Sequence, residues 1–239
     1  MQMVTRFLFL PRLMTVALLC FVPCAFGQGS VSINMNSGGP YTMNGVYVGA
    51  YSATINGQAA QIICDDFAHD TYLNESWTAN VTTFSNLTSS NTPMWSGLAN
   101  SATLYADAAW LATQMFVPAN QNNATEGYLA FALWSLFNPN ALKGLSASQL
   151  AQVNAWLAAI PKGLTPSQFA NFFIYTPDLT ASITCNGGKC PTAPPQEFLG
   201  FMSMPEGGAA LGYLLLAGLS CGLAMVLRSR RQAGLTGSV

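Results

Sequence analysis

The chain reads Val46-Tyr47-Val48-Gly49-Ala50-Tyr51-Ser52-Ala53-Thr54-Ile55-Asn56-Gly57, and three residues later Gln61-Ile62-Ile63-Cys64. The first ten of these residues are rich in the β-branched and aromatic side chains that strands favour. Asn-Gly is the dipeptide that most strongly favours a two-residue hairpin turn, because both residues tolerate a positive φ. The stretch therefore predicts antiparallel strands joined by a tight turn.

Neighbouring segments extend this pattern. Val31 to Met35 alternates apolar and polar residues, and Trp77, Ala79 and Val81 share one face of a further strand. From Ser30 to about Leu87 we expect an antiparallel β subdomain of four or five strands.

The period changes from about Met94 to Phe173, where apolar residues recur at helical spacing. Two helix starts carry capping boxes, Ser146 with Gln149 and Thr165 with Gln168, and a short helix from Glu126 to Phe137 ends before a proline. The two apolar stripes are Leu104, Ala108, Leu111 and Met115, and Leu150, Val153, Leu157 and Ile160.

After the helical region, strands are expected at Leu179 to Thr184 and at Phe198 to Met202. The order β, then α, then β predicts an α+β fold with an N-terminal antiparallel β subdomain, a central helical subdomain and returning C-terminal strands.

Both ends of the chain have the features of export. Arg6 and Arg12 precede an apolar stretch, and Ala25-Phe26-Gly27 offers small residues for a signal peptidase, so residues 1–27 are expected to be a cleaved signal peptide. Residues 28–203 would then form one exported domain.

The C-terminal residues 204–239 have three parts. Met204-Pro205-Glu206-Gly207-Gly208 is followed by an uncharged run, 209–227, long enough for a transmembrane helix. A basic cluster at 228–231 follows, in which Arg228, Arg230 and Arg231 would remain on the cytoplasmic side.

This tail resembles the PEP-CTERM sorting signal of Gram-negative bacteria with exopolysaccharide-rich surfaces. The resemblance implies cutting near Pro205 and Glu206 by an exosortase, a membrane-embedded cysteine transpeptidase. It also implies an inner-membrane-anchored intermediate that is then delivered to the cell surface or extracellular matrix. The alternative is an ordinary single-pass anchor.

Charge excludes one class of partner. Residues 28–203 hold eight acidic and three basic side chains, so the exported domain has no basic surface for nucleic acid.

Cys185 and Cys190 flank a Gly-Gly turn and are expected to form a local disulfide in an oxidising compartment. With only one histidine in the chain, no zinc site and no cofactor are expected.

The densest polar cluster runs from Cys64 to Asp70. As an enzyme site it would use Cys64 as nucleophile and His69 as base. As a calcium site it would use Asp65, Asp66 and Asp70. The third interpretation is a β-bend whose Asp side chains accept backbone hydrogen bonds, with Cys64 as a small buried residue.

A second resemblance links two distant segments, Ile63-Cys64-Asp65-Asp66-Phe67 and Ala130-Phe131-Ala132-Leu133-Trp134. Their order is similar to that in bacterial thioester domains, surface-adhesin modules that join a Cys of the first segment to a Gln of the second. Here Ala130 stands at the Gln position, so the covalent function does not carry over.

The sequence thus favours a non-enzymatic exported protein of the surface or matrix. Its expected partners are signal peptidase, an exosortase-type enzyme, the membrane and exopolysaccharide. An adhesin-like module for a glycan or surface protein is the first alternative, with loop residue Trp95 as a possible stacking surface for sugars. An enzyme using Cys64 and His69 is the second.

Overall fold

The Asn56-Gly57 dipeptide forms the predicted hairpin, between β4 (Tyr51–Ile55) and β5 (Gln58–Cys64). Both turn residues have positive φ, 50° and 79°, as a two-residue turn of this kind requires. The computed structural model in which this is seen describes residues 29–185 and 194–201, which form a mixed α+β fold.

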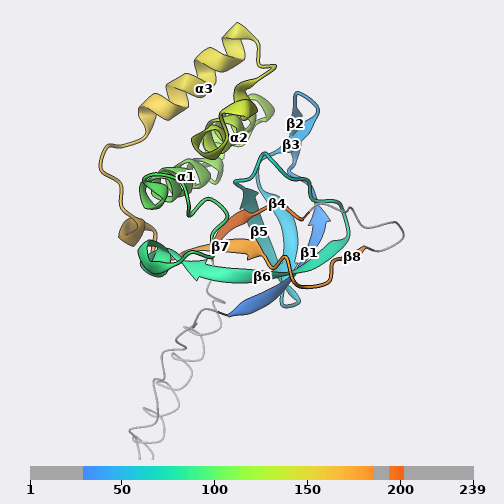
Figure 1. The fold of residues 1–239 in the computed structure, drawn as a ribbon. Coiled ribbons are helices and arrows are strands. Elements are labelled where there is room, and N and C mark those ends of the chain that lie inside the picture. The colour runs from blue at the N-terminus through green and yellow to red at the C-terminus, as the bar shows by residue number, and fades with distance from the viewer. Residues whose placement is uncertain (1–28, 186–193, 202–239) are drawn as a thin grey trace, which may run out of the picture.

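The main sheet closes on itself into a barrel-like ring (Figure 1). Its strands follow the order β1-β4-β5-β9-β7-β6, and β6 pairs back onto β1; every pairing is antiparallel. β8 extends from β6, and β2 and β3 form a separate hairpin. The remaining bounds are β1 Ser30–Ser37, β2 Tyr41–Met43, β3 Val46–Val48, β6 Glu75–Thr83, β7 Phe172–Pro177, β8 Thr184–Cys185 and β9 Phe198–Phe201.

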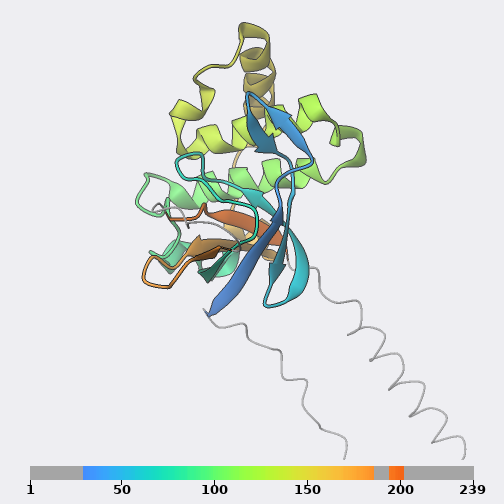
Figure 2. The same cartoon turned by 90° about the vertical axis from the view of Figure 1, so that its right-hand side faces the viewer.

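Strand direction places both ends of the described chain at the same end of the ring. Because all pairings are antiparallel, β1 begins and β9 ends at one rim, whereas β5 ends and β6 begins at the opposite rim. Figure 2 shows this arrangement from the side. The Cys64–Asp70 loop therefore lies at the rim away from the chain ends.

Aromatic side chains fill the inside of the ring. The ring of Phe198 lies 5.7 Å from Tyr51 and 6.0 Å from Trp77, although β9 is adjacent to neither β4 nor β6. These contacts therefore cross the interior. Because successive strand residues face opposite sides, Glu197 and Leu199 point outward, toward the helices.

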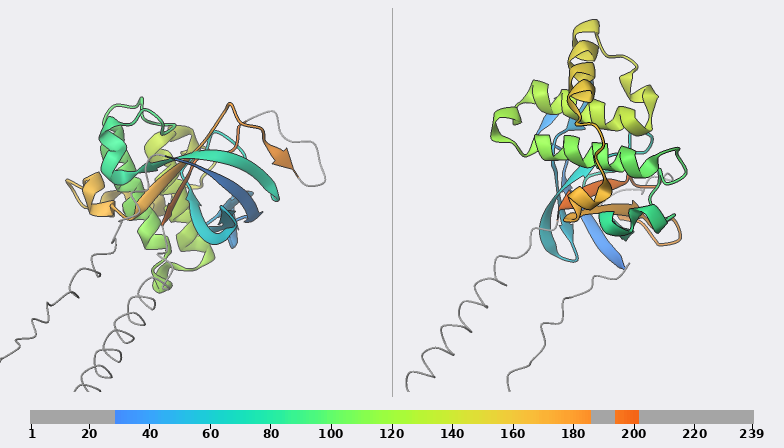
Figure 3. Two further views of the ribbon diagram at one scale, coloured as in Figure 1. Left: turned by 90° about the horizontal axis from the view of Figure 1, so that it is seen from below. Right: turned by 90° about the vertical axis from the view of Figure 1, so that its left-hand side faces the viewer.

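Three helices cover one outer side of the ring (Figures 1 and 3). They are α1 (Ser101–Met115), α2 (Asn123–Phe137) and α3 (Ala147–Ala159). α3 lies farthest from the sheet, and Val153 is the only one of its residues that is fully buried. Four short 3-10 helices connect these elements: η1 Phe84–Ser89, η2 Pro118–Asn120, η3 Pro139–Leu142 and η4 Pro166–Phe169.

The capping boxes are confirmed at the level of hydrogen bonds. Ser146 begins α3, with its hydroxyl accepting from Gln149 N–H and the Gln149 side chain accepting from Ser146 N–H. The box of Thr165 and Gln168 is also present, but it begins only the single turn of η4.

Two predictions near the end of the helical region are wrong. The sequence pattern predicts a helical region up to about Phe173, yet Phe172–Pro177 is strand β7, buried along its whole length. This strand lies between the inside of the ring and the helices, so both of its faces are buried and mostly apolar. It therefore lacks the alternation that identifies a half-buried strand.

The strand predicted at Leu179 to Thr184 is also wrong. The carboxylate of Asp178 accepts from Thr180 N–H at 2.9 Å and from the Thr180 hydroxyl at 2.7 Å, which turns the chain away after β7. Leu179 is 73 % exposed, and only Thr184–Cys185 returns to the sheet, as β8. By contrast, the prediction that the last strand rejoins the first sheet is confirmed, because β9 lies between β5 and β7.

No helix within residues 29–185 and 194–201 has the length and apolarity needed to cross a membrane. The helix expected at 209–227 lies outside the residues that the structure describes.

Candidate functional site

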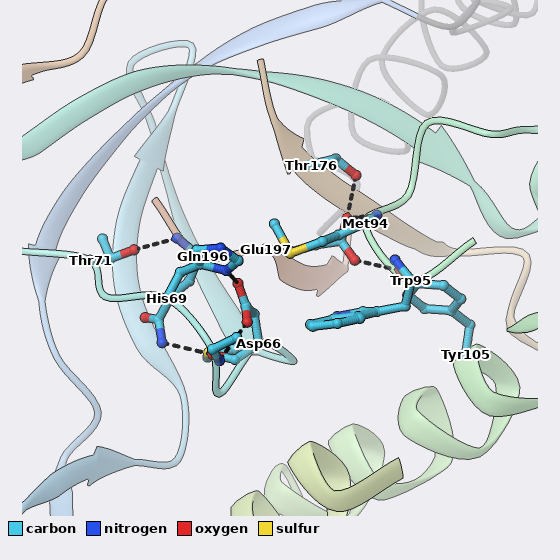
Figure 4. Close-up of polar contacts among 11 residues, drawn as sticks. Asp66, His69, Thr71, Met94, Trp95, Tyr105, Thr176, Gln196 and Glu197 are labelled. Atoms are coloured by element: carbon cyan, nitrogen blue, oxygen red, sulfur yellow. Dashed lines mark hydrogen bonds and ion pairs between the residues drawn. The ribbon is translucent and has the colours of Figure 1, made fainter. Parts of the chain in front are cut away.

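The loop after β5 is organised by Asp66, whose side chain is fully buried. Its Oδ1 accepts from Ala68 N–H at 2.7 Å, and its Oδ2 lies 2.6 Å from Nδ1 of His69. The Asp66 carbonyl accepts from the Cys64 thiol at 3.1 Å and from the Gln196 amide at 2.8 Å. Figure 4 shows Asp66, His69, Thr71 and Gln196 together. The loop is thus held in one shape by internal hydrogen bonds.

Cys64 is unfavourably placed for nucleophilic chemistry. Its side chain is 2 % exposed, and its thiol already donates to Asp66. Burial raises the pKa of the Cys64 thiol well above its usual value, and the neighbouring acids, Asp66 first and then Asp65, raise it further. A reactive cysteine needs the opposite, a stabilised thiolate with solvent access. His69 contacts Asp66 rather than the thiol.

The three aspartates proposed as calcium ligands do not converge. Asp65 lies buried toward the helices, Asp66 is occupied within the loop, and Asp70 is exposed. Within residues 29–185 and 194–201, no cluster of three or more His, Cys, Asp or Glu side chains is placed to hold a metal ion.

A second polar cluster, which the sequence did not suggest, lies between the ring and the helices. Its centre is the buried carboxylate of Glu197, which accepts from the Tyr105 hydroxyl at 2.5 Å and from Met94 N–H at 2.7 Å. The hydroxyl of Thr176 also donates to it. In Figure 4 Glu197 points toward Tyr105 and Thr176, whereas its neighbour Gln196 points toward the loop. No motif spacing in the sequence could have revealed the cluster, since its donors come from a loop, α1 and β7.

Asp65 is the other acid of this cluster. Burial raises the pKa of Asp65 well above its usual value, and the charges of Glu197 and then Asp66 raise it further. Neither of its carboxyl oxygens has an N–H or hydroxyl donor among the described residues. Glu197, with three donors, is the better-stabilised anion, so the raised pKa of Asp65 favours the neutral form of that carboxyl. The pair therefore buries one negative charge rather than two.

The two segments that resemble thioester-domain motifs meet in space. The indole N–H of Trp134 donates to the Cys64 carbonyl at 2.9 Å, and the Phe67 ring lies 5.4 Å from the Trp134 ring and 6.0 Å from Phe131. Ala130 is buried one helical turn before Trp134, on the same side of α2. The junction joins the end of β5 to α2 across 70 residues of chain.

Several predicted residues have a different setting or lie beyond the described part. Trp95 is partly buried: it stacks on Phe137 at 5.9 Å and packs against the core, so its role as a stacking surface for sugars stays a prediction. Cys185 lies in β8, but Cys190 falls outside the described residues, so the disulfide stays a prediction. The sorting residues Pro205, Glu206, Gly207, Gly208, Arg228, Arg230 and Arg231 also fall outside them.

Comparison with known proteins adds no assignment: the chain matches no protein-family model, no curated protein and no solved structure.

Proposed function

We propose that this chain is a non-enzymatic exported protein of the bacterial surface or extracellular matrix, sorted by an exosortase-type system. The observation that carries the proposal is the tail, in which Met204-Pro205-Glu206, the uncharged run 209–227 and the basic cluster 228–231 follow in order. The signal-like residues 1–27 support it. Signal peptidase, the exosortase-type enzyme, the membrane and possible exopolysaccharide are the partners that this route implies.

The geometry of the described domain is compatible with such processing. β9, the last strand of the ring, ends at Phe201, so a cut near Pro205 and Glu206 would remove no strand residue. The chain also leaves from the rim opposite the Cys64–Asp70 loop. An anchored intermediate would therefore present that loop away from the point of attachment.

The buried polar groups support a non-enzymatic role. The Cys64 thiol has a raised pKa and is buried from solvent. The acids Asp65 and Glu197 are also fully buried, between the sheet and the helices. A catalytic acid or nucleophile must reach its substrate. These groups instead connect β5, β9, β7 and α1.

Replacing Pro205 and Glu206 by alanine is expected to leave the unprocessed chain in the inner membrane, because the processing enzyme would no longer recognise its site. Fractionation and immunoblotting of the source bacterium measure this. A matched control replaces the exposed residues Pro118 and Asp70 by alanine, which also removes one proline and one carboxylate, and it should be released normally. Normal release of the Pro205/Glu206 variant would contradict the proposed exosortase-type sorting.

A second candidate function is an adhesin-like module with the organisation of a thioester domain, whose ligand is a glycan or surface protein. The contact of Trp134 with Cys64 favours it, because it brings together the two segments that such domains connect. The missing amide at Ala130 would make this module a non-covalent binder.

Ala130→Gln tests that organisation. If the segments are arranged as in a thioester domain, the Cys64 thiol should attack the new side-chain amide. The Sγ–Cδ bond forms, the Cδ–Nε2 bond breaks, and the thiol proton leaves with the ammonia released. Intact mass should fall by one ammonia, and the change should be absent when Cys64→Ser is added. A folded Ala130→Gln protein of unchanged mass would rule out the thioester-domain organisation.

A further inference from the structure

Glu126, in the first turn of α2, is buried without a partner. It is 4 % exposed, and its Oε2 has no hydrogen-bond donor among the described residues. The backbone of Gly49 lies against it: a Cβ added at Gly49 would stand 1.8 Å from Oε2. Gly49 also has a φ of +89°, which other residues rarely adopt. The chain thus uses a glycine to let the carboxylate lie in this position.

This carboxylate lines a groove of about 330 Å³, within the size range of small-ligand sites. The other walls combine neutral polar and apolar residues in equal number, and Glu126 is the only charged residue of the lining. The side chains that could form hydrogen bonds with a ligand are Ser37, Tyr41, Ser52, Gln61 and Gln121.

A second hollow, of about 490 Å³, adjoins the first. The two share Ser52, Gln61 and Phe116, and the second is otherwise lined by residues that include Phe201. The rings of Phe116 and Phe201 meet edge to face at 4.9 Å. The two hollows therefore adjoin, and aromatic rings form part of their wall.

The groove lacks the positive charge that its carboxylate would favour. Burial raises the pKa of Glu126 to about 6, so the group is mostly ionised at pH 7. Tyr41 is the only other titratable group that faces the groove. A ligand ammonium in the groove would supply the missing positive charge beside this carboxylate.

We propose that this groove binds an amino sugar, with its free ammonium group against Glu126, its hydroxyl groups against the neutral polar side chains and its ring on Phe116. The serine and glutamine side chains match sugar hydroxyls, and an aromatic wall suits the apolar face of a sugar ring. A lysine side chain is the rival ligand for this carboxylate, but its methylene stem would leave the serine and glutamine side chains of the groove without partners. The proposal does not depend on how the protein is exported.

Calorimetry on the full-length chain in detergent tests it, with a glucosamine hexasaccharide as the probe. We expect binding that falls about tenfold or more in Glu126→Gln, which keeps the shape of the side chain and removes its charge. Asp107→Asn is the matched control, because it removes a partly buried carboxylate that does not line the groove and should leave binding unchanged. Binding should weaken as the pH falls from 7 to 5, since Glu126 then takes up its proton.

Two further probes separate the possible ligands. The N-acetylated hexasaccharide and a lysine-containing peptide should both bind much more weakly than the free amino sugar. Equal binding of either probe, no binding of the glucosamine hexasaccharide, or unchanged binding in Glu126→Gln would each overturn the proposal. Thermal melting checks the fold of Glu126→Gln, which should melt no lower than the parent because a buried carboxyl with a raised pKa has been neutralised.

Discussion

Glu197→Leu should lower the free energy of unfolding by about 3–5 kcal/mol, the range for removing one member of a buried charged network. The substitution leaves the Tyr105 hydroxyl, the Thr176 hydroxyl and Met94 N–H without their acceptor. All three donors lie between the ring and the helices, where water cannot replace the lost oxygen atoms. Urea unfolding followed by tryptophan fluorescence measures the change.

Asp65→Asn is the matched control, and it should act in the opposite direction. Asp65 is expected to hold a proton in the folded state, whereas in the unfolded chain at pH 8 it is ionised. An asparagine amide can donate to Glu197 without that proton uptake, so the free energy of unfolding should rise by about 1 kcal/mol or more. Two equally destabilising substitutions would show that both carboxyls are ionised acceptors, and the shared-proton account would fail.

Raising the pH from 5 to 8 should destabilise the protein, with a fall in melting temperature of roughly 5–10 °C. The pKa values of Asp65 and Glu197 are raised by burial, and that of Glu126 is raised to about 6. A carboxyl with a raised folded-state pKa contributes stability that is fully present below its unfolded value, near 4, and is lost as the pH rises through its folded value. The stability contributed by Glu126 is therefore lost between about pH 4.5 and pH 6. The stability contributed by Asp65 begins to be lost near pH 3.8, and this loss continues to higher pH.

Calorimetric melting of the parent and Asp65→Asn at a series of pH values measures this slope. The melting temperature of the variant should depend less on pH, because the variant lacks Asp65, whose pKa is raised well above its usual value. A parent protein that is most stable near pH 8 would contradict the assignment of raised pKa values.

Local signals in the sequence predicted local structure well. Asn56-Gly57 fixed a hairpin and Ser146 with Gln149 fixed a helix start, because each needs only residues close in sequence. Asn44-Gly45 carries the same turn signal and joins β2 to β3, with φ values of 50° and 83°, so this second hairpin was equally predictable from the local sequence.

Contacts between segments far apart in the chain were harder to predict from the sequence. Closure of the ring depends on β6 pairing with both β1 and β7, which no local pattern encodes. The Glu197 cluster and the Glu126 groove likewise combine residues from segments far apart in the chain. The contact between the Cys64 and Trp134 segments could be suspected only from a resemblance to another family. The bend around Asp66 was predictable because its aspartate accepts from the backbone only two residues away.

The most direct test of the proposed sorting is the intact mass of the mature protein recovered from its source organism under non-reducing conditions. The account predicts a chain that begins near Gln28 and ends close to Pro205 and Glu206, with the tail removed. A mass that still includes residues 209–239 would contradict it and make this an ordinary membrane-anchored protein.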